Sequence, residues 1–226
     1  MAKRTAVLLG ASGLVGGYCL RGLVAAQEYS RVILLVRKEL SLSEAGVPAN
    51  RVEQRVMNLA ETTSGDFVAV TDLFCALGTT IAKAGSQPAF RAVDYELPMH
   101  AARAAKEAGV EQFLLVSSAG ANPGSANFYL RTKGELERDL TALKFPALHI
   151  FRPGLLLGRR QEFRLSEALA QRIGPLLNPV MIGPMRRYRS VRAKTVGEAM
   201  VAAALRGRSG IFTYHYDEII GFTRNQ

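Results

Sequence analysis

Three side chains with complementary chemistry lie close together in this sequence. Tyr129 and Lys133 are four residues apart, so they share one face of any helix that contains both. An ammonium beside a phenol favours the phenolate, and a phenol that ionises near neutral pH can exchange a proton with a substrate oxygen. Ser118 ends the preceding apolar run and can donate a hydrogen bond to the same oxygen, with Ser117 as the adjacent alternative. This arrangement predicts proton transfer at a carbonyl or alcohol.

A glycine turn follows the first apolar run of the chain. Gly10, Gly13 and Gly16 lie between a predicted strand and a predicted helix, and this geometry holds a pyrophosphate at a helix N-terminus. Gly10 allows the tight turn, Gly13 lets the backbone approach the phosphates, and Gly16 lets the helix pack close to the strand. The alternative is a purely structural turn. The residues of the predicted phosphate cradle are Gly10, Ser12, Gly13, Leu14, Val15 and Gly16.

The end of the second predicted strand indicates which nucleotide the turn would hold. An NAD-specific fold places an acidic residue there to accept hydrogen bonds from the ribose hydroxyls. This chain has Arg37 and Lys38 instead, and two cations can pair with a 2′-phosphate, Arg37 as a planar fork. We therefore expect NADP(H) as the cofactor. The alternative is that both residues are ordinary surface charges.

Strands and helices alternate along most of the chain. The predicted strands cover residues 6–9, 31–36, 52–56, 73–77, 113–116, 148–151 and 211–216. The predicted helices cover residues 15–26, 88–108 and 127–143, with a last one from a capping box at 195–198 to near 207. Most strands are apolar throughout, so helices must cover both faces of a parallel sheet.

The sequence therefore predicts an α/β fold, specifically a Rossmann doubly wound parallel sheet with a small C-terminal substrate-side appendage. We expect a single NAD(P)-binding domain over residues 1–226. Within that domain, residues 155–226 would contribute the substrate-side cap.

Charge and hydropathy restrict the partners. The 226 residues carry a net charge of +10. The basic residues are scattered apart from Arg159, Arg160 and a run over 186–194, and they form no nucleic-acid-binding motif, so surface charge is favoured over a nucleic-acid partner. No apolar run reaches the roughly 18 residues that a membrane span needs, and no secretory signal precedes the first strand. We expect no membrane span and a cytoplasmic location.

The metal-binding residue types are dispersed. Cys19 and Cys75 lie far apart, which is typical of buried reduced thiols. His100, His149 and His215 are isolated from one another. We expect no metal site.

Taken together, these motifs resemble those of atypical short-chain dehydrogenase/reductases. More closely, the chain resembles the Tat-interacting tumour-suppressor (CC three) oxidoreductase family and its bacterial relatives. The resemblance weakens beyond residue 165. It rests on residues 10–13, 74–80, 83–85, 115–118, 127–130, 133–135, 151–154 and 160–162.

The resemblance implies roles for individual residues. Tyr129 would be the proton donor or acceptor, with Lys133 and Ser118 as its partners, and Arg37 would meet the 2′-phosphate. The residues that would border the cofactor are Leu77, Gly78, Thr79, Pro153, Leu155, Leu156 and Arg164. The chain departs from the common dehydrogenase pattern at Asp94, where that pattern has asparagine.

The favoured function is an NADP(H)-dependent oxidoreductase that transfers hydride between nicotinamide and a small carbonyl or alcohol substrate. One alternative is a regulatory or sensor protein that binds NADP(H) with little turnover, because a fold does not fix a function. A sugar epimerase or dehydratase ranks last. The sequence is compatible with either a monomer or a homodimer.

Overall fold

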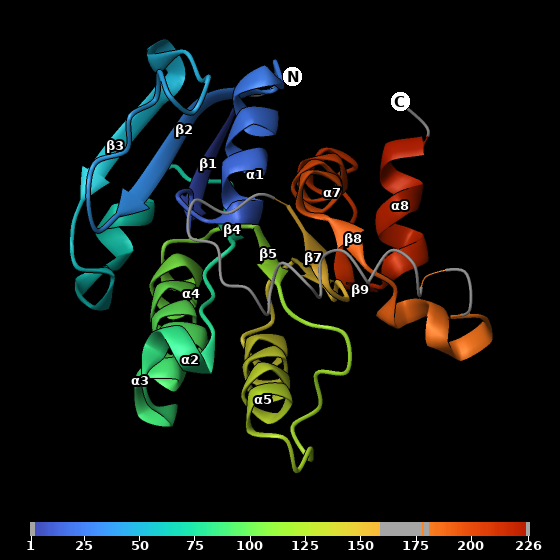
Figure 1. Ribbon diagram of the computed structural model, residues 1–226. Coiled ribbons are helices and arrows are strands. Elements are labelled where there is room, and N and C mark those ends of the chain that lie inside the picture. The colour runs from blue at the N-terminus through green and yellow to red at the C-terminus, as the bar shows by residue number, and fades with distance from the viewer. Residues whose placement is uncertain (1–2, 159–177, 179–180, 225–226) are drawn as a thin grey trace.

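The computed structural model describes residues 3–158, 178 and 181–224. Its centre is a seven-stranded parallel sheet with the strand order β3-β2-β1-β4-β5-β6-β9 (Figure 1). The strands are β1 (Arg4–Leu9), β2 (Tyr29–Val36), β3 (Val52–Val56), β4 (Asp72–Cys75), β5 (Gln112–Val116), β6 (Ala147–Phe151) and β9 (Gly210–Tyr214). This arrangement confirms the predicted Rossmann doubly wound sheet, whose strand order reverses direction between β1 and β4.

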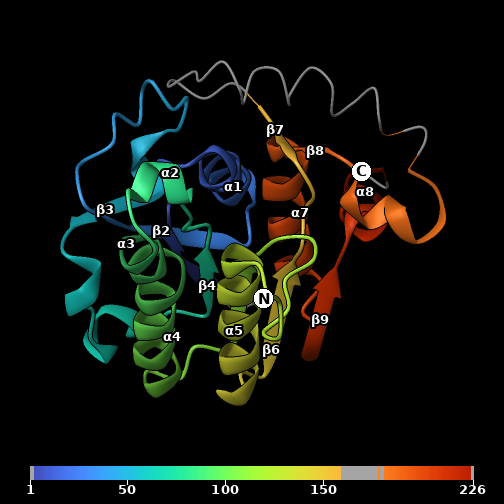
Figure 2. The ribbon, with the colours of Figure 1, turned by 60° about the horizontal axis from the view of Figure 1, so that its bottom comes forward.

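Helices cover both faces of the sheet (Figures 1 and 2). One face packs against α1 (Leu14–Ala25), α7 (Ala193–Leu205) and α8 (Tyr216–Arg224). The other packs against α4 (Leu97–Glu107) and α5 (Phe128–Ala142). The remaining helical segments are α2 (Ile81–Ala84), α3 (Gln87–Arg91), a π-helical turn η4 (Ala92–Glu96) and the 3₁₀ turns η1 (Ala49–Arg51), η2 (Leu59–Glu61), η3 (Ser64–Phe67) and η6 (Gly183–Tyr188).

The central strands are buried on both sides because their side chains alternate between two apolar layers. In β1, Ala6 and Leu8 enter the layer of α1 and α7, whereas Val7 and Leu9 enter the layer of α4 and α5. All four side chains are fully buried. Because the strands are parallel, their carboxyl ends meet at one edge of the sheet, where α/β folds bind their ligands.

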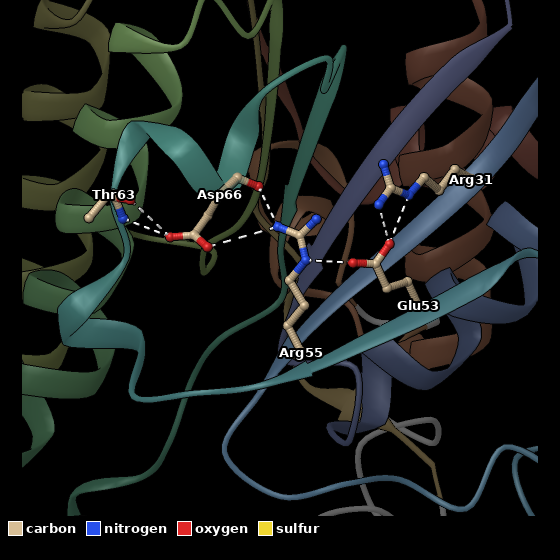
Figure 3. A network of polar contacts seen from close by, with 5 residues as sticks. All are labelled: Arg31, Glu53, Arg55, Thr63 and Asp66. Atoms are coloured by element: carbon tan, nitrogen blue, oxygen red, sulfur yellow. Dashed lines mark hydrogen bonds and ion pairs between the residues drawn. The ribbon is translucent and has the colours of Figure 1, made fainter.

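The edge strand β3 is anchored by charges on one of its faces (Figure 3). Glu53 accepts hydrogen bonds from Nε of Arg31 at 2.8 Å and from Nε of Arg55 at 2.7 Å. Arg55 also donates to the backbone carbonyl of Asp66 at 3.0 Å, and the Asp66 carboxylate accepts the Thr63 amide at 2.9 Å. This network ties β3 to η3, and charged side chains on an edge strand disfavour pairing with another chain.

The structure differs from several of the predicted elements. The helix expected over 88–108 is interrupted by the π turn η4. The last predicted helix begins at Ala193, without a side-chain cap, because the short pair of β7 (Leu156–Leu157) and β8 (Val191–Arg192) delivers the chain directly into it. The last predicted strand ends two residues early, at Tyr214, and is followed by the unpredicted α8.

No helix within the described residues is long and apolar enough to cross a membrane. The same part of the chain contains no cluster of three or more histidine, cysteine, aspartate or glutamate side chains that could hold a metal ion.

Candidate functional site

The glycine turn joins β1 to α1 at the point where the strand order reverses. Gly10 has a φ of +82°, and its carbonyl accepts a hydrogen bond from the Gly13 amide at 2.9 Å. A Cβ added to Gly10 would lie 2.6 Å from the carbonyl of Ala76, just after β4. A Cβ added to Gly16 would lie 2.0 Å from the carbonyl oxygen of Gly10. Gly16 therefore lets the helix pack on the turn itself rather than on the strand.

The first turn of α1 offers its amides to a ligand. Gly13 is the N-cap residue, so no side chain caps the helix, and no acidic residue occupies the first turn. Ser12 and Gly13 are exposed, whereas Val15 and Gly16 are buried. Leu14 is half-buried and packs close to Gly158, where an added Cβ would lie 2.8 Å from Leu14 Cδ1. Free amides at a helix N-terminus are the donors that bind phosphate groups.

Arg37 and Lys38 directly follow β2, and both are exposed. Neither has an ion-pair partner among the described residues. The loop that carries them is held in place by Gln54 of β3, which accepts from the Leu40 amide at 2.9 Å and donates to the Leu40 carbonyl at 3.0 Å. The two cations are thus available for an anionic ligand at the carboxyl end of β2.

Lys133 is held by a buried carboxylate. Its Nζ lies 2.7 Å from Oδ1 of Asp94, and the two side chains are only 4% and 1% exposed. The other Asp94 oxygen accepts the Thr79 amide at 2.8 Å, so one carboxylate ties α5 to the loop after β4. Burial lowers the pKa of Lys133, but the Asp94 carboxylate and the nearby Tyr129 phenol raise it by more, so this pKa lies above its usual value.

Tyr129 lies in the first turn of α5, which begins after Asn127 accepts the Leu130 amide at 3.1 Å. The Tyr129 side chain is half-buried, and its ring packs against Phe90 of α3 with 5.6 Å between centroids. Tyr129 and Lys133 are thus one turn apart on a capped helix. The Tyr129 hydroxyl has no hydrogen-bond partner within the described residues, and it is therefore available to a ligand.

The two serines at the end of β5 differ in their partners. The buried Ser117 hydroxyl donates to the Glu137 carboxylate, and that carboxylate also accepts Nε of Arg152 at 3.0 Å. Ser118 is half-buried, and its hydroxyl makes only a long contact of 3.4 Å with the Ala119 carbonyl. Ser118 is consequently the serine with a hydroxyl to offer, which favours it over the adjacent alternative.

The other residues expected to border the cofactor lie along the same edge of the sheet. Leu77 is half-buried and Gly78 exposed, and a Cβ added to Gly78 would lie 3.5 Å from Asp94 Oδ1. The Pro153 carbonyl accepts the Ala119 amide at 2.8 Å, which joins the ends of β5 and β6. Leu155 is exposed and Leu156 begins β7. Arg164 lies outside the described residues.

Comparison with known proteins identifies the family. The model of the HIM1 family matches residues 43–182, more than half of the chain. The mitochondrial protein FMP52 of Lodderomyces elongisporus is 33% identical over 95% of this chain and 92% of its own length. The rat protein HTATIP2 is 38% identical over 76% of this chain and 71% of its own length. The chain belongs to the HIM1 family. The predicted relationship to atypical short-chain dehydrogenase/reductases of the HTATIP2 kind is thereby confirmed.

Solved structures share the fold of this HIM1-family protein at low sequence identity. A UDP-N-acetylglucosamine 4-epimerase from Methanobrevibacter ruminantium aligns with a TM-score of 0.72 and 14% identity over 95% of this chain and 77% of its own. A UDP-glucuronic acid 4-epimerase from Bacillus cereus, in complex with NAD, aligns with a TM-score of 0.68 and 13% identity over 93% and 77%. These alignments show that this chain shares its fold with the two epimerases.

The expected cytoplasmic location is wrong. The FMP52 relatives are named mitochondrial proteins, and those of L. elongisporus and Saccharomyces cerevisiae are 33% and 39% identical to this HIM1-family protein. The expectation came from two features: no apolar run is long enough to span a membrane, and no secretory signal was recognised before the first strand. Such a pattern speaks against a membrane span, but it does not distinguish one aqueous compartment from another.

Sequence reasoning missed part of the site. Asp94 stood out only as a departure from a pattern, and its pairing with Lys133 depends on the π turn. Glu137 and Arg152 had no predicted role in the site, although Glu137 is 6% exposed, pairs with Arg152 and accepts the Ser117 hydroxyl. The available signal was the spacing of Lys133 and Glu137, which are four residues apart on the same helix face.

Proposed function

We propose that this HIM1-family protein is an NADP(H)-dependent oxidoreductase of the short-chain dehydrogenase/reductase type, acting on a small carbonyl or alcohol substrate. The observation that carries the proposal is the pair of Tyr129 and Lys133, one helical turn apart. Asp94 holds Lys133 at the loop after β4, and the end of that strand lies against the glycine turn at Gly10.

Two features support a dinucleotide at this edge. A Cβ at Gly16 would enter the backbone of the turn, and a Cβ at Gly10 would enter the backbone just after β4, as expected where a chain leaves its helix amides open to phosphates. Arg37 and Lys38 suit a 2′-phosphate, because they are exposed and lack acidic partners among the described residues. The residues proposed to line the dinucleotide are Gly10, Ser12, Gly13, Leu14, Val15, Gly16, Arg37, Lys38, Leu77, Gly78, Thr79, Pro153, Leu155 and Leu156.

The chain's own residues would handle the proton and the orientation of the substrate. Bound NADP(H) would supply or accept the hydride. The Tyr129 hydroxyl would give a proton to a carbonyl oxygen, or take one from an alcohol. Lys133 would hold a positive charge beside that phenol, and the Ser118 hydroxyl would donate a hydrogen bond to the same substrate oxygen. The short pair of β7 and β8, together with η6, would form the substrate side of the cleft.

Cofactor preference is tested by direct titration. The chain contains no tryptophan, so the emission of NADPH or NADH can be followed as protein is added. We expect tighter binding of NADPH, and we expect the double variant Arg37→Ala/Lys38→Ala to lose that preference. Arg138→Ala removes an exposed cation from α5 and serves as the control. Tighter binding of NADH by the unaltered protein would refute the proposed role of Arg37 and Lys38.

Turnover is tested with a panel of aldehydes and ketones and NADPH oxidation as the readout. We expect activity in the unaltered protein and a loss of about 10²-fold or more in Tyr129→Phe, the range typical of a lost general acid. Equal activity in both proteins would refute the role of Tyr129. Tight NADPH binding without turnover across the panel would favour the sensor function instead.

A further inference from the structure

Two cations of the proposed reaction site and its surroundings, Lys133 and Arg152, are each paired with a buried carboxylate. Lys133 pairs with Asp94 at 2.7 Å. Arg152, which directly follows β6, donates from Nε to both Glu137 oxygens, at 3.0 and 3.1 Å. Glu137 is 6% exposed and lies one turn after Lys133 on α5. Each carboxylate cancels the charge of the cation beside it.

The Asp94 and Glu137 carboxylates also bind the backbone and side chains that shape the site. Asp94 accepts the Thr79 amide, and Glu137 accepts the Ser117 hydroxyl beside Ser118. Taking a carboxylate out of water is costly unless it is paired and hydrogen-bonded. Both carboxylates meet this condition, so both pairs are fixed parts of the site rather than loose surface contacts.

Charge is distributed differently over different parts of the molecule. The chain as a whole has a net charge of +10, and Arg37 and Lys38 at the nucleotide end have no acidic partner within the described residues. By contrast, positive and negative side chains balance one another around the cavity of about 240 Å³ between η6 and α8, because its lining includes two arginines and two carboxylates. These four residues are Arg186, Arg187, Asp217 and Glu218.

We propose that Asp94 and Glu137 are specificity-determining residues that cancel the cations at the reaction end, so that the site takes substrates uncharged around the carbonyl. This inference rests on the proposed function. An unpaired ammonium or guanidinium in a site of low dielectric would attract a substrate carboxylate strongly. With both cations paired, the site offers such a carboxylate no net attraction, and the carboxylate would lose its hydration on entry.

The test uses two aldehydes of similar shape and different charge, 4-nitrobenzaldehyde and 4-carboxybenzaldehyde. For each protein we measure the ratio of kcat/KM values with NADPH, and the ratio of dissociation constants by ligand-observed NMR without cofactor. Comparing ratios between proteins cancels the different intrinsic reactivity of the aldehydes. The variants are Asp94→Asn and Glu137→Gln, which keep a hydrogen-bond acceptor. The Arg152 guanidinium that Glu137→Gln uncovers stays protonated at any assay pH.

The control is Glu53→Gln, which removes the same charge from the β3 network in Figure 3. We expect the unaltered protein to favour the nitro compound. The ratio should shift toward the carboxylate on the order of tenfold in either site variant, the effect of one unit charge within roughly 10 Å at an effective dielectric constant near 20. It should not shift in Glu53→Gln. Thermal melting followed by circular dichroism identifies a site variant that fails to fold. The ratio measured with the other site variant then decides whether the inference holds.

Three results would overturn the inference. They are a preference for the carboxylate in the unaltered protein, unchanged ratios in the folded site variants, and an equal shift in Glu53→Gln. If the aldehydes bind without turnover, the proposed oxidoreductase function fails, and the ratio of dissociation constants still decides the inference. If neither aldehyde binds to any of the proteins, both proposals fail.

Discussion

Replacing Gly16 with alanine would put a methyl group where α1 packs on the glycine turn. The added Cβ would lie 2.0 Å from the Gly10 carbonyl oxygen, whereas ordinary contacts begin near 3.4 Å. The obstacle is backbone that also accepts the Gly13 amide, so it cannot move without breaking the turn. Overpacking typically costs about 1–3 kcal/mol, which outweighs the gain of up to about 1 kcal/mol from alanine's helix propensity.

Gly17 provides a matched control in the same helix. An added Cβ there would lie 3.7 Å from the Ala11 carbonyl oxygen, an ordinary contact. We expect Gly17→Ala to raise the free energy of unfolding by up to about 1 kcal/mol, and Gly16→Ala to lower it and to weaken NADPH binding. Urea unfolding and NADPH fluorescence measure the two effects. If Gly16→Ala is as stable as Gly17→Ala, the close packing of helix and turn is wrong.

Three further predictions concern buried polar and thiol groups. Lys133→Met should lower the free energy of unfolding by about 3–5 kcal/mol, because it leaves the buried Asp94 carboxylate unpaired. The double variant Lys133→Met/Asp94→Asn should recover most of that loss in urea unfolding. Additive losses of the two substitutions would contradict the pairing. Burial, aided by the charge of Arg208, lowers the pKa of His149 to about 4, so its protonation opposes folding. Stability should fall by at most about 3 kcal/mol from pH 6.5 to pH 4, and His149→Gln should flatten that fall in unfolding measured against pH. Cys19 and Cys75 should react with a thiol reagent only on unfolding, because burial raises both pKa values, that of Cys75 to about 11; rapid labelling of the folded protein would contradict this.

The sequence alone determined the central fold because its signals are local. The buried strands are continuous apolar runs, and the glycine turn between the first of them and a helix has one common structural solution. Asn127 opens α5 as an N-cap, which places Tyr129 and Lys133 on one face regardless of what the helix packs against. These features need only neighbouring residues to be recognised.

The C-terminal part was harder to predict because its elements depend on packing. The helix α8 has nine residues, which is too short to be stable alone, and it forms because Ile219 and Phe222 are buried in the layer of α1 and α7. The helix α7 begins at Ala193, directly after β8 of the β7–β8 pair, rather than at the capping box predicted over 195–198. In both cases a distant contact overrides the local signal.

The tertiary structure alone decided which charges meet at the site. The sequence placed Tyr129 and Lys133 on one helix face, but it did not show that the π turn η4 aims Asp94 at Lys133 and at the Thr79 amide. It left Ser117 and Ser118 as alternatives, which the Glu137–Arg152 pair distinguishes by engaging Ser117. Residue types and local spacing can be read from the sequence. The partner of a buried charge depends on long-range packing, which here brings Asp94 to Lys133 and Arg152 to Glu137.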